Sequence, residues 1–214
     1  MSKLYLEELK AAMSSDIFSR LDTDKQEATS IKGKIESFIS ASKDTLTGNQ
    51  YDSYRTQFET FGTTMEKRIA LADSLSSAIK EALQLLIDYM GEDMYLDTAK
   101  LGEYTNSRDA CAKSIERLNK MLNETKTVTY KGSDGKTYSK TENVYDSNEV
   151  RAQIAKAQEV LTELDRIIKK IQGLDAVYAQ AESILNSAFS QIPSFGSVVT
   201  AIKPNGIYSY HATS

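Results

Sequence analysis

Apolar residues recur every three or four positions along most of the chain, with charged residues between them. This spacing predicts long amphipathic α-helices. The first apolar stripe extends from Leu4 to Leu46 and predicts one long helix, softened at residues 21–24. Both prolines, Pro193 and Pro204, come after nearly all of the stripes. Most of the chain is therefore free of the residue that breaks helices most strongly.

A second helix is predicted from Tyr51 to about residue 90, after the pattern breaks at residues 47–49. Two helices of similar length joined by a short turn form an antiparallel hairpin, which we expect over residues 4–90. Gly91 follows where a glycine commonly ends a helix. The apolar stripe of this second helix comprises Tyr51, Tyr54, Phe58, Phe61, Met65, Ile69, Ala72, Leu75, Ile79, Leu83 and Leu86.

A third helix is predicted over residues 97–124, and the period then changes. Between residues 125 and 145, apolar and polar residues alternate on either side of the turn residues Gly132 and Gly135. This arrangement predicts a small, solvent-exposed β-hairpin. An isolated hairpin is only marginally stable, so we expect it to lean on the helices or to become ordered on a partner.

Two further helices complete the predicted secondary structure. Asp146 followed by Glu149 is the signature of a capping box, which predicts the start of a helix over residues 147–172. Gly173 is expected to end that helix, and a fifth helix follows over residues 175–191.

The pattern as a whole predicts an elongated all-α domain over residues 1–192, with a long helical hairpin, additional helices and one β-hairpin insertion. Residues 193–214 are expected to be a C-terminal tail or the start of a linker. A composition with 40% hydrophobic and 26% charged residues in 214 agrees with a globular domain. The formal net charge of −4 argues against a nucleic-acid partner.

Scarce histidine and cysteine exclude much catalytic and metal chemistry. Cys111 and His211 are the single residues of their types, so no Cys/His zinc site can form. A catalytic triad would need His211, which lies close to the C-terminal end of the sequence. Glu7 and Glu8 interrupt the apolar run that a secretory signal needs, and no stretch is apolar enough to span a membrane.

The remaining chemical motifs are weak. Residues 22–27 resemble the start of a calcium-binding loop, but Glu27 occupies the position that requires glycine. Residues 131–136 predict a turn and not a phosphate-binding loop, because a strand follows them. We therefore expect no catalytic residues, cofactor or metal. The aromatic residues Tyr51, Tyr54, Phe58 and Phe61 predict a seam between helices, which a helix of a partner protein could also fill.

The predicted turn between the first two helices reads Leu46-Thr47-Gly48, with an aromatic residue, Tyr51, three positions later and another at Tyr54. Gly48 can adopt the positive φ that reverses the chain. A turn of this sequence between two long helices resembles the LXG family. These are N-terminal domains of polymorphic toxins exported by the type VII (Esx) secretion system of Gram-positive bacteria, and they are related to the small WXG helical hairpins.

The resemblance implies a non-catalytic domain that binds small, helical WXG-like proteins encoded beside it. The complex would be presented to the secretion ATPase and exported without a signal peptide, to act outside the cell or at its surface in antagonism between bacteria. Before export the domain would be cytoplasmic. LXG proteins normally carry a C-terminal toxin domain, which we expect to be missing after Pro193.

Relatives in this secretion system use an aromatic-x-x-x-acid export signal after a helical hairpin. Tyr89 with Asp93 is the best-placed candidate, because it falls at the end of the second helix. The other matches are Phe18 with Asp22, Tyr130 with Asp134, Tyr138 with Glu142, Tyr145 with Glu149, and Tyr178 with Glu182.

We hypothesise a type VII targeting module. The first alternative is a membrane-active, pore-forming helical protein in which residues 192–202 insert, although that segment is shorter than a membrane span. The second alternative is a structural coiled-coil protein. An enzyme has the least support, because no acid-base set converges in the sequence.

Overall fold

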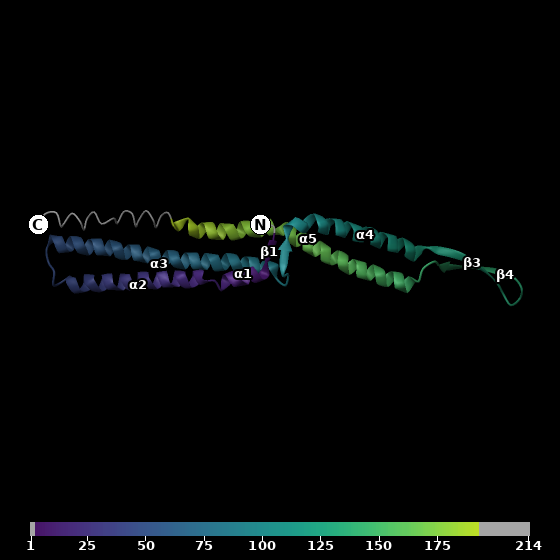
Figure 1. Ribbon diagram of the computed structural model, residues 1–214, viewed down its shortest axis with the longest axis horizontal. Helices are drawn as coiled ribbons and strands as arrows, with labels where there is room; N and C mark the ends of the chain where they lie inside the picture. Colours follow the sequence, from purple (N-terminus) through teal and green to yellow (C-terminus); the bar gives the residue numbers. More distant parts are fainter. Residues whose placement is uncertain (1–2, 193–214) are drawn as a thin grey trace. The chain divides into compact units, whose positions relative to one another are not determined.

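The computed structural model describes residues 3–192, and Figure 1 shows the order of the elements. This part of the chain is mainly α-helical, with two small two-stranded sheets, which confirms the predicted fold class. The elements are β1 (Lys3–Tyr5), α1 (Leu6–Met13), α2 (Asp16–Ser42), α3 (Asn49–Met90), β2 (Tyr95–Asp97), the 3₁₀-helix η1 (Thr98–Lys100), α4 (Leu101–Asn123), β3 (Thr125–Lys131), β4 (Thr137–Asn143) and α5 (Ser147–Phe189).

These elements form two compact units. The hairpin unit contains Tyr5–Met94 together with the part of α5 that follows Asp175. The β-hairpin unit contains β1 up to Leu4 and the segment Tyr95–Asp175. The sequence predicted one domain over residues 1–192, and the division into two units was not anticipated.

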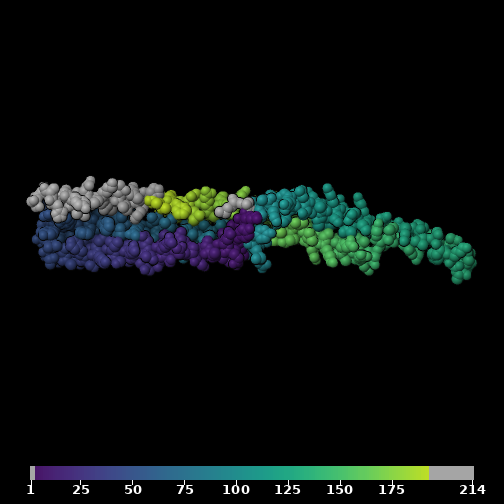
Figure 2. All heavy atoms as spheres, in the orientation of Figure 1, coloured from purple at the N-terminus to yellow at the C-terminus, as the bar shows by residue number. Residues whose placement is uncertain are grey.

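The antiparallel pair of α2 and α3 is the main feature of the hairpin unit and confirms the predicted helical hairpin. Small residues allow the two helices to approach closely. A Cβ atom on Gly62 of α3 would lie 3.6 Å from the side chain of Ile35 on α2. Ile35 and Met65 are buried in the same unit. Figure 2 shows the atoms of α2 and α3 in contact along the hairpin.

The prediction of one continuous helix before the turn is wrong. Helix α1 ends at Met13, and α2 begins at Asp16. The amides of Ser14 and Ser15 bond to carbonyls three residues back, as in a tightened last turn. Serine competes with the helical backbone for hydrogen bonds and favours helix ends. The softening expected at residues 21–24 is absent, because α2 continues through them.

The β-hairpin unit has its core between α4 and the first part of α5. Leu118, Val150 and Ile154 form a buried cluster, and Met121 and Leu122 pack against it. The third predicted helix begins later than expected, at Leu101. The preceding residues form β2 and η1, whose first turn is capped by the buried Asp97 carboxylate.

The predicted β-hairpin is confirmed. Strands β3 and β4 are antiparallel, with Tyr130 opposite Tyr138 and Thr125 opposite Asn143. Gly135 has a φ of 77° in the connecting turn, a conformation that glycine adopts without strain. Figure 1 shows the hairpin extending beyond the adjacent ends of α4 and α5.

Helix α5 is continuous, so the predicted separation into helices over residues 147–172 and 175–191 is wrong. Its predicted start is confirmed, because the Asp146 carboxylate accepts hydrogen bonds from the amides of Asn148 and Glu149 at 2.8 and 3.3 Å. Gly173 costs an exposed helix only about 1 kcal/mol relative to alanine, and Ile171 and Leu174 on either side of it are buried. The expected tail, residues 193–214, lies outside the described residues.

Candidate functional site

The turn that joins α2 and α3 contains the Leu46-Thr47-Gly48 sequence. Helix α2 ends at Ser42, and the Leu46 amide still bonds to the Ser42 carbonyl at 3.0 Å. Gly48 precedes α3 with φ 114° and ψ 157°, a region of backbone conformation that is essentially restricted to glycine. The positive φ predicted for Gly48 is therefore confirmed, and a side chain here would be strained.

Arg55 closes this turn from the first part of α3. Its Nη1 atom donates hydrogen bonds to the carbonyl oxygens of Ser42 at 3.1 Å and Leu46 at 2.7 Å. Its Nη2 atom bonds to the carboxylate of Asp52, one turn earlier in α3. The guanidinium group thus adds a second donor to the Ser42 carbonyl and satisfies the Leu46 carbonyl, which lies beyond the end of α2. The Arg55 side chain is only 14% exposed, so it is a fixed part of the turn.

An aromatic patch lies beside this turn, on the hairpin unit. We define it as Phe38 of α2 with Tyr51, Phe58 and Phe61 of α3, whose side chains are 38–41% exposed. Phe38 and Phe58 touch with ring centroids 4.9 Å apart. Tyr54 is half-buried in the same stretch of α3. Further along the stripe Met65 is only 5% exposed, so the helices bury the later part of the predicted seam and leave its aromatic end accessible.

In the described part of the chain, four cross-helix ion pairs connect α2 to α3 beyond the aromatic patch. Arg68 binds the carboxylate of Asp24 through Nε and Nη2, with Nε 2.9 Å from the nearer oxygen. Glu27 lies 3.6 Å from the same guanidinium group. The other pairs are Lys25 with Asp73 at 2.8 Å and Lys32 with Glu66 at 3.0 Å.

These ion pairs explain the sequence that resembled a calcium loop. Asp24 and Glu27 lie within a continuous helix and face a cation from the neighbouring helix. Within residues 3–192 no group of three or more acidic, histidine or cysteine side chains is arranged to hold a metal ion.

The candidate export pair, Tyr89 and Asp93, lies at the end of α3. Tyr89 is half-buried, and burial raises the pKa of its hydroxyl above the ordinary value. The helix ends at Met90, and Gly91 turns the chain with a φ of 58°. Asp93 therefore lies beyond the helix and is not one helical turn from Tyr89 on the same face. The predicted C-terminal cap at Gly91 is confirmed.

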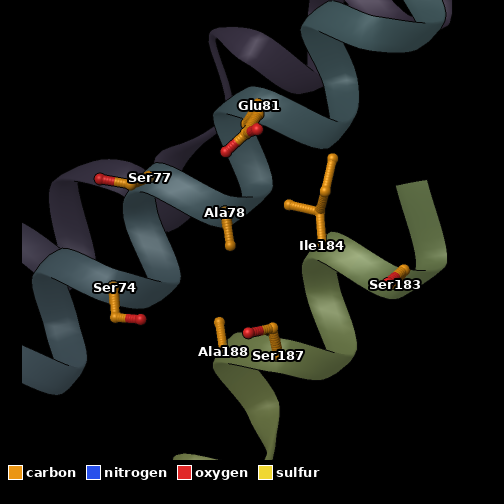
Figure 3. Close-up of a pocket in the computed structure, with 8 residues that line it drawn as sticks. All are labelled: Ser74, Ser77, Ala78, Glu81, Ser183, Ile184, Ser187 and Ala188. Carbon is orange, nitrogen blue, oxygen red and sulfur yellow. The ribbon is translucent and has the colours of Figure 1, made fainter. Parts of the chain in front are cut away.

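A shallow pocket of about 430 Å³ lies between α3 and the last part of α5. Figure 3 shows that its lining consists mostly of serine and alanine side chains from the two helices. The Gln191 amide donates a hydrogen bond to the Ser74 hydroxyl at 3.2 Å beside it. Glu81 is the single ionisable side chain among the lining residues. The pocket thus offers no acid-base pair or nucleophile with a neighbouring base, and it is best interpreted as a small-residue packing seam.

Arg55 is the site residue that the sequence analysis missed. The spacing of a basic residue seven positions after the turn glycine was the available signal, but an arginine in a helix usually faces solvent.

Within residues 3–192, no helix is both long and apolar enough to cross a membrane. No protein-family model, curated protein sequence or solved structure matches this chain.

Proposed function

We propose that this chain is a non-catalytic targeting domain of a type VII secretion effector, which binds a small helical partner protein through the aromatic patch. The observation that carries the proposal is the turn itself. A Leu-Thr-Gly sequence whose glycine has a positive φ joins two long helices, Arg55 closes the turn, and the exposed aromatic patch begins at Tyr51, three residues after Gly48. The resemblance to the LXG family rests on the same turn.

The aromatic patch supports a helical partner for a physical reason. Clustered, exposed aromatic rings mark interaction surfaces more often than isolated ones do, and aromatic residues contribute most of the binding energy at many interfaces. Tyr51, Phe58 and Phe61 recur at helical spacing along one face of α3. A partner that lays an amphipathic helix along this face would cover all three rings and bury the edge shared with Phe38.

The same proposal includes the expected export of the protein from the cell. The domain and its partner would form in the cytoplasm, be presented to the secretion ATPase, and leave a Gram-positive cell without a signal peptide. Tyr89 and Asp93 remain the candidate export residues. Because the chain turns between them, each would contact the secretion machinery separately, and Tyr89→Ala and Asp93→Ala should therefore impair export independently.

Co-expression with the small helical proteins encoded next to this gene tests the proposal. Size-exclusion chromatography with light scattering should give the mass of a heteromeric complex. Phe61→Ala should weaken that complex at least tenfold, because it removes a ring that is 38% exposed and at the patch. Tyr145→Ala is the matched control, since Tyr145 is 40% exposed but belongs to the β-hairpin unit. Failure of the chain to form a complex with any of these small helical proteins would overturn the proposal.

A further inference from the structure

Strands β3 and β4 form a two-stranded sheet without a layer of its own unit covering it. Apart from the half-buried Val128, Gly132 and Glu142, every residue of Thr125–Asn143 is exposed. Isolated two-stranded hairpins are marginally stable in water. The space-filling view in Figure 2 shows this hairpin projecting beyond the helical part of the β-hairpin unit.

Local contacts nevertheless hold the hairpin in one conformation. The Tyr138 hydroxyl donates a hydrogen bond to the Asp134 carboxylate at 2.6 Å, and the rings of Tyr130 and Tyr138 stack with centroids 5.9 Å apart. A Cβ atom on Gly132 would lie 2.7 Å from the Tyr138 ring, so glycine is what allows this ring to fold over the turn. The two strands are therefore already in an extended conformation that can pair with a further strand.

The hydrogen bonds between β3 and β4 show which backbone groups of β3 face away from β4. The Gly132 amide bonds to the Lys136 carbonyl, and the Val144 amide bonds to the Glu124 carbonyl, each at 2.9 Å. In an antiparallel pair the inward-bonded residues alternate with outward-facing ones. Gly132 and Glu124 are inward-bonded, so the outward amides and carbonyls of β3 belong to Thr125, Thr127, Thr129 and Lys131.

The outer edge of β3 is available and favourable for strand pairing. Among the described residues, this sheet has only its two strands. An edge of consecutive outward-facing amides and carbonyls is a template for an added strand. Threonine, which occupies three of the four outward positions, is a favourable residue for strands.

Charge distinguishes the two edges. On β4, Lys140 is paired with Glu142 at 2.6 Å. On β3, Lys126 and Lys131 have no carboxylate within ion-pair distance in the described part of the chain. The two lysines lie on opposite faces of the strand, because their positions differ by an odd number. Strand β3 thus carries two lysines and no acidic residue, whereas the whole chain has a net charge of −4. Lys126 lies opposite Glu142 of β4 and interacts with it electrostatically, so Lys131, opposite Thr137, is the less compensated of the two charges.

We propose that β3 is a docking edge for an extended segment of a partner protein that carries acidic side chains opposite Lys126 and Lys131. The segment would add a third strand through the outward groups of Thr127 and Thr129, and its two acids would lie on opposite faces to meet the two lysines. Backbone hydrogen bonds would supply affinity and the acids would supply selectivity, as in other strand-addition complexes. This site is separate from the aromatic patch and does not depend on the function proposed above.

Two synthetic peptides test this inference on the full chain. The acidic probe is capped Thr-Glu-Thr-Val-Thr-Val-Glu-Thr, which places glutamates opposite both lysines in antiparallel pairing. The matched control replaces both glutamates by lysines. Fluorescence anisotropy should show at least tenfold tighter binding of the acidic probe, with the difference shrinking at high salt. Amide exchange measured by NMR should slow at Thr127 and Thr129.

Substitutions then distinguish loss of binding at the β3 edge from loss of the hairpin fold. Thr127→Pro removes an outward amide without touching the inner ladder and should abolish binding, whereas Thr127→Val should retain it. Ser139→Pro makes the same change on the β4 edge and should leave binding intact. Loss of the NMR ring shifts of Tyr130 and Tyr138 would mean that proline has disturbed the hairpin. In that case the variant with both Lys126→Glu and Lys131→Glu tests the inference, because it should bind the lysine peptide more tightly than the acidic peptide.

Three results would overturn the inference. They are equal binding of the two peptides, amide protection at Ser139 in place of Thr127, and self-association of the chain through this hairpin detected by light scattering. Loss of helical-partner binding in the Phe61→Ala variant would leave the β3 result unchanged, so the two proposals fail independently.

Discussion

Arg55 Nη1 lies 2.7 Å from the carbonyl oxygen of Leu46, and this hydrogen bond spans the turn between α2 and α3. It links the leucine of the Leu-Thr-Gly sequence to the first part of the following helix. The same guanidinium group also bonds to the end of α2 at Ser42. One side chain thus connects both helices of the hairpin to their turn.

Replacing Arg55 should destabilise the hairpin through lost donors and not through lost charge. Arg55→Lys keeps the charge but cannot reach both carbonyls with one planar group. We expect it to lower the free energy of unfolding by about 1–3 kcal/mol, the cost of leaving the half-buried Leu46 carbonyl without its donor. Urea denaturation followed by circular dichroism measures this. Lys67→Ala, an exposed position on α3, is the control and should change stability little; an equal loss in both variants would refute the role of Arg55.

Two glycine substitutions should have opposite signs. Gly48→Ala places a side chain at φ 114° and should destabilise the protein by about 1–3 kcal/mol. Gly33→Ala lies within α2 with no atom near the added Cβ, and should stabilise it by about 0.5–1 kcal/mol. The difference between the two midpoints of unfolding measures the strain in the turn. Similar effects from both variants would mean that Gly48 does not need its positive φ.

The Arg68 and Asp24 pair should contribute more to stability than the exposed cross-helix pairs. Arg68 is 26% exposed and binds Asp24 with two donors, whereas Lys25 and Asp73 are 40% and 55% exposed. A double-mutant cycle with Arg68→Met and Asp24→Asn should give a coupling energy of about 1 kcal/mol, and the cycle for Lys25 and Asp73 about 0.5 kcal/mol or less. Coupling energies in the reverse order would contradict this ranking.

Order in the β3–β4 turn should depend on pH in both directions. The Tyr138 hydroxyl lowers the pKa of Asp134 below its ordinary value of 3.8, and the same hydrogen bond raises the pKa of Tyr138 above 10.0. The contribution of Asp134 is complete above its unfolded pKa and is lost as pH falls through the lowered folded value. The contribution of Tyr138 is present below its unfolded pKa and is lost as pH rises through the raised folded value.

NMR shifts of the Tyr138 ring should therefore change at both ends of the pH range and remain constant between them. Tyr138→Phe removes the shared hydrogen bond, so Asp134 in that variant should titrate at a higher pH than in the parent protein. An unchanged Asp134 titration would contradict the pairing.

Long apolar stripes explain why the sequence predicted the helical hairpin and the β-hairpin well. The break at Ser14 was missed because Leu9 and Met13 continue the stripe up to it, and periodicity alone does not register competition from serine hydroxyls. The opposite error occurred at Gly173, where the modest cost of glycine is smaller than the stabilisation from burying Leu174 nearby.

The candidate site was predicted only in part. Tyr51, Phe58 and Phe61 were found from their spacing, but spacing cannot tell a buried seam from an exposed one. That distinction depends on where α2 ends and on how closely it approaches α3. Arg55 was missed because its partners lie up to thirteen residues earlier in the chain, and only the reversal at Gly48 brings them within reach.

Site-specific photo-crosslinking tests the central claim most directly. A p-benzoylphenylalanine residue at position 61 should crosslink to a small helical protein encoded beside this gene when the two are co-expressed. The same photoreactive residue at position 145, an equally exposed aromatic site in the other unit, should give no such product. Crosslinking from position 145 alone, or from neither position in a verified complex, would contradict binding through the aromatic patch.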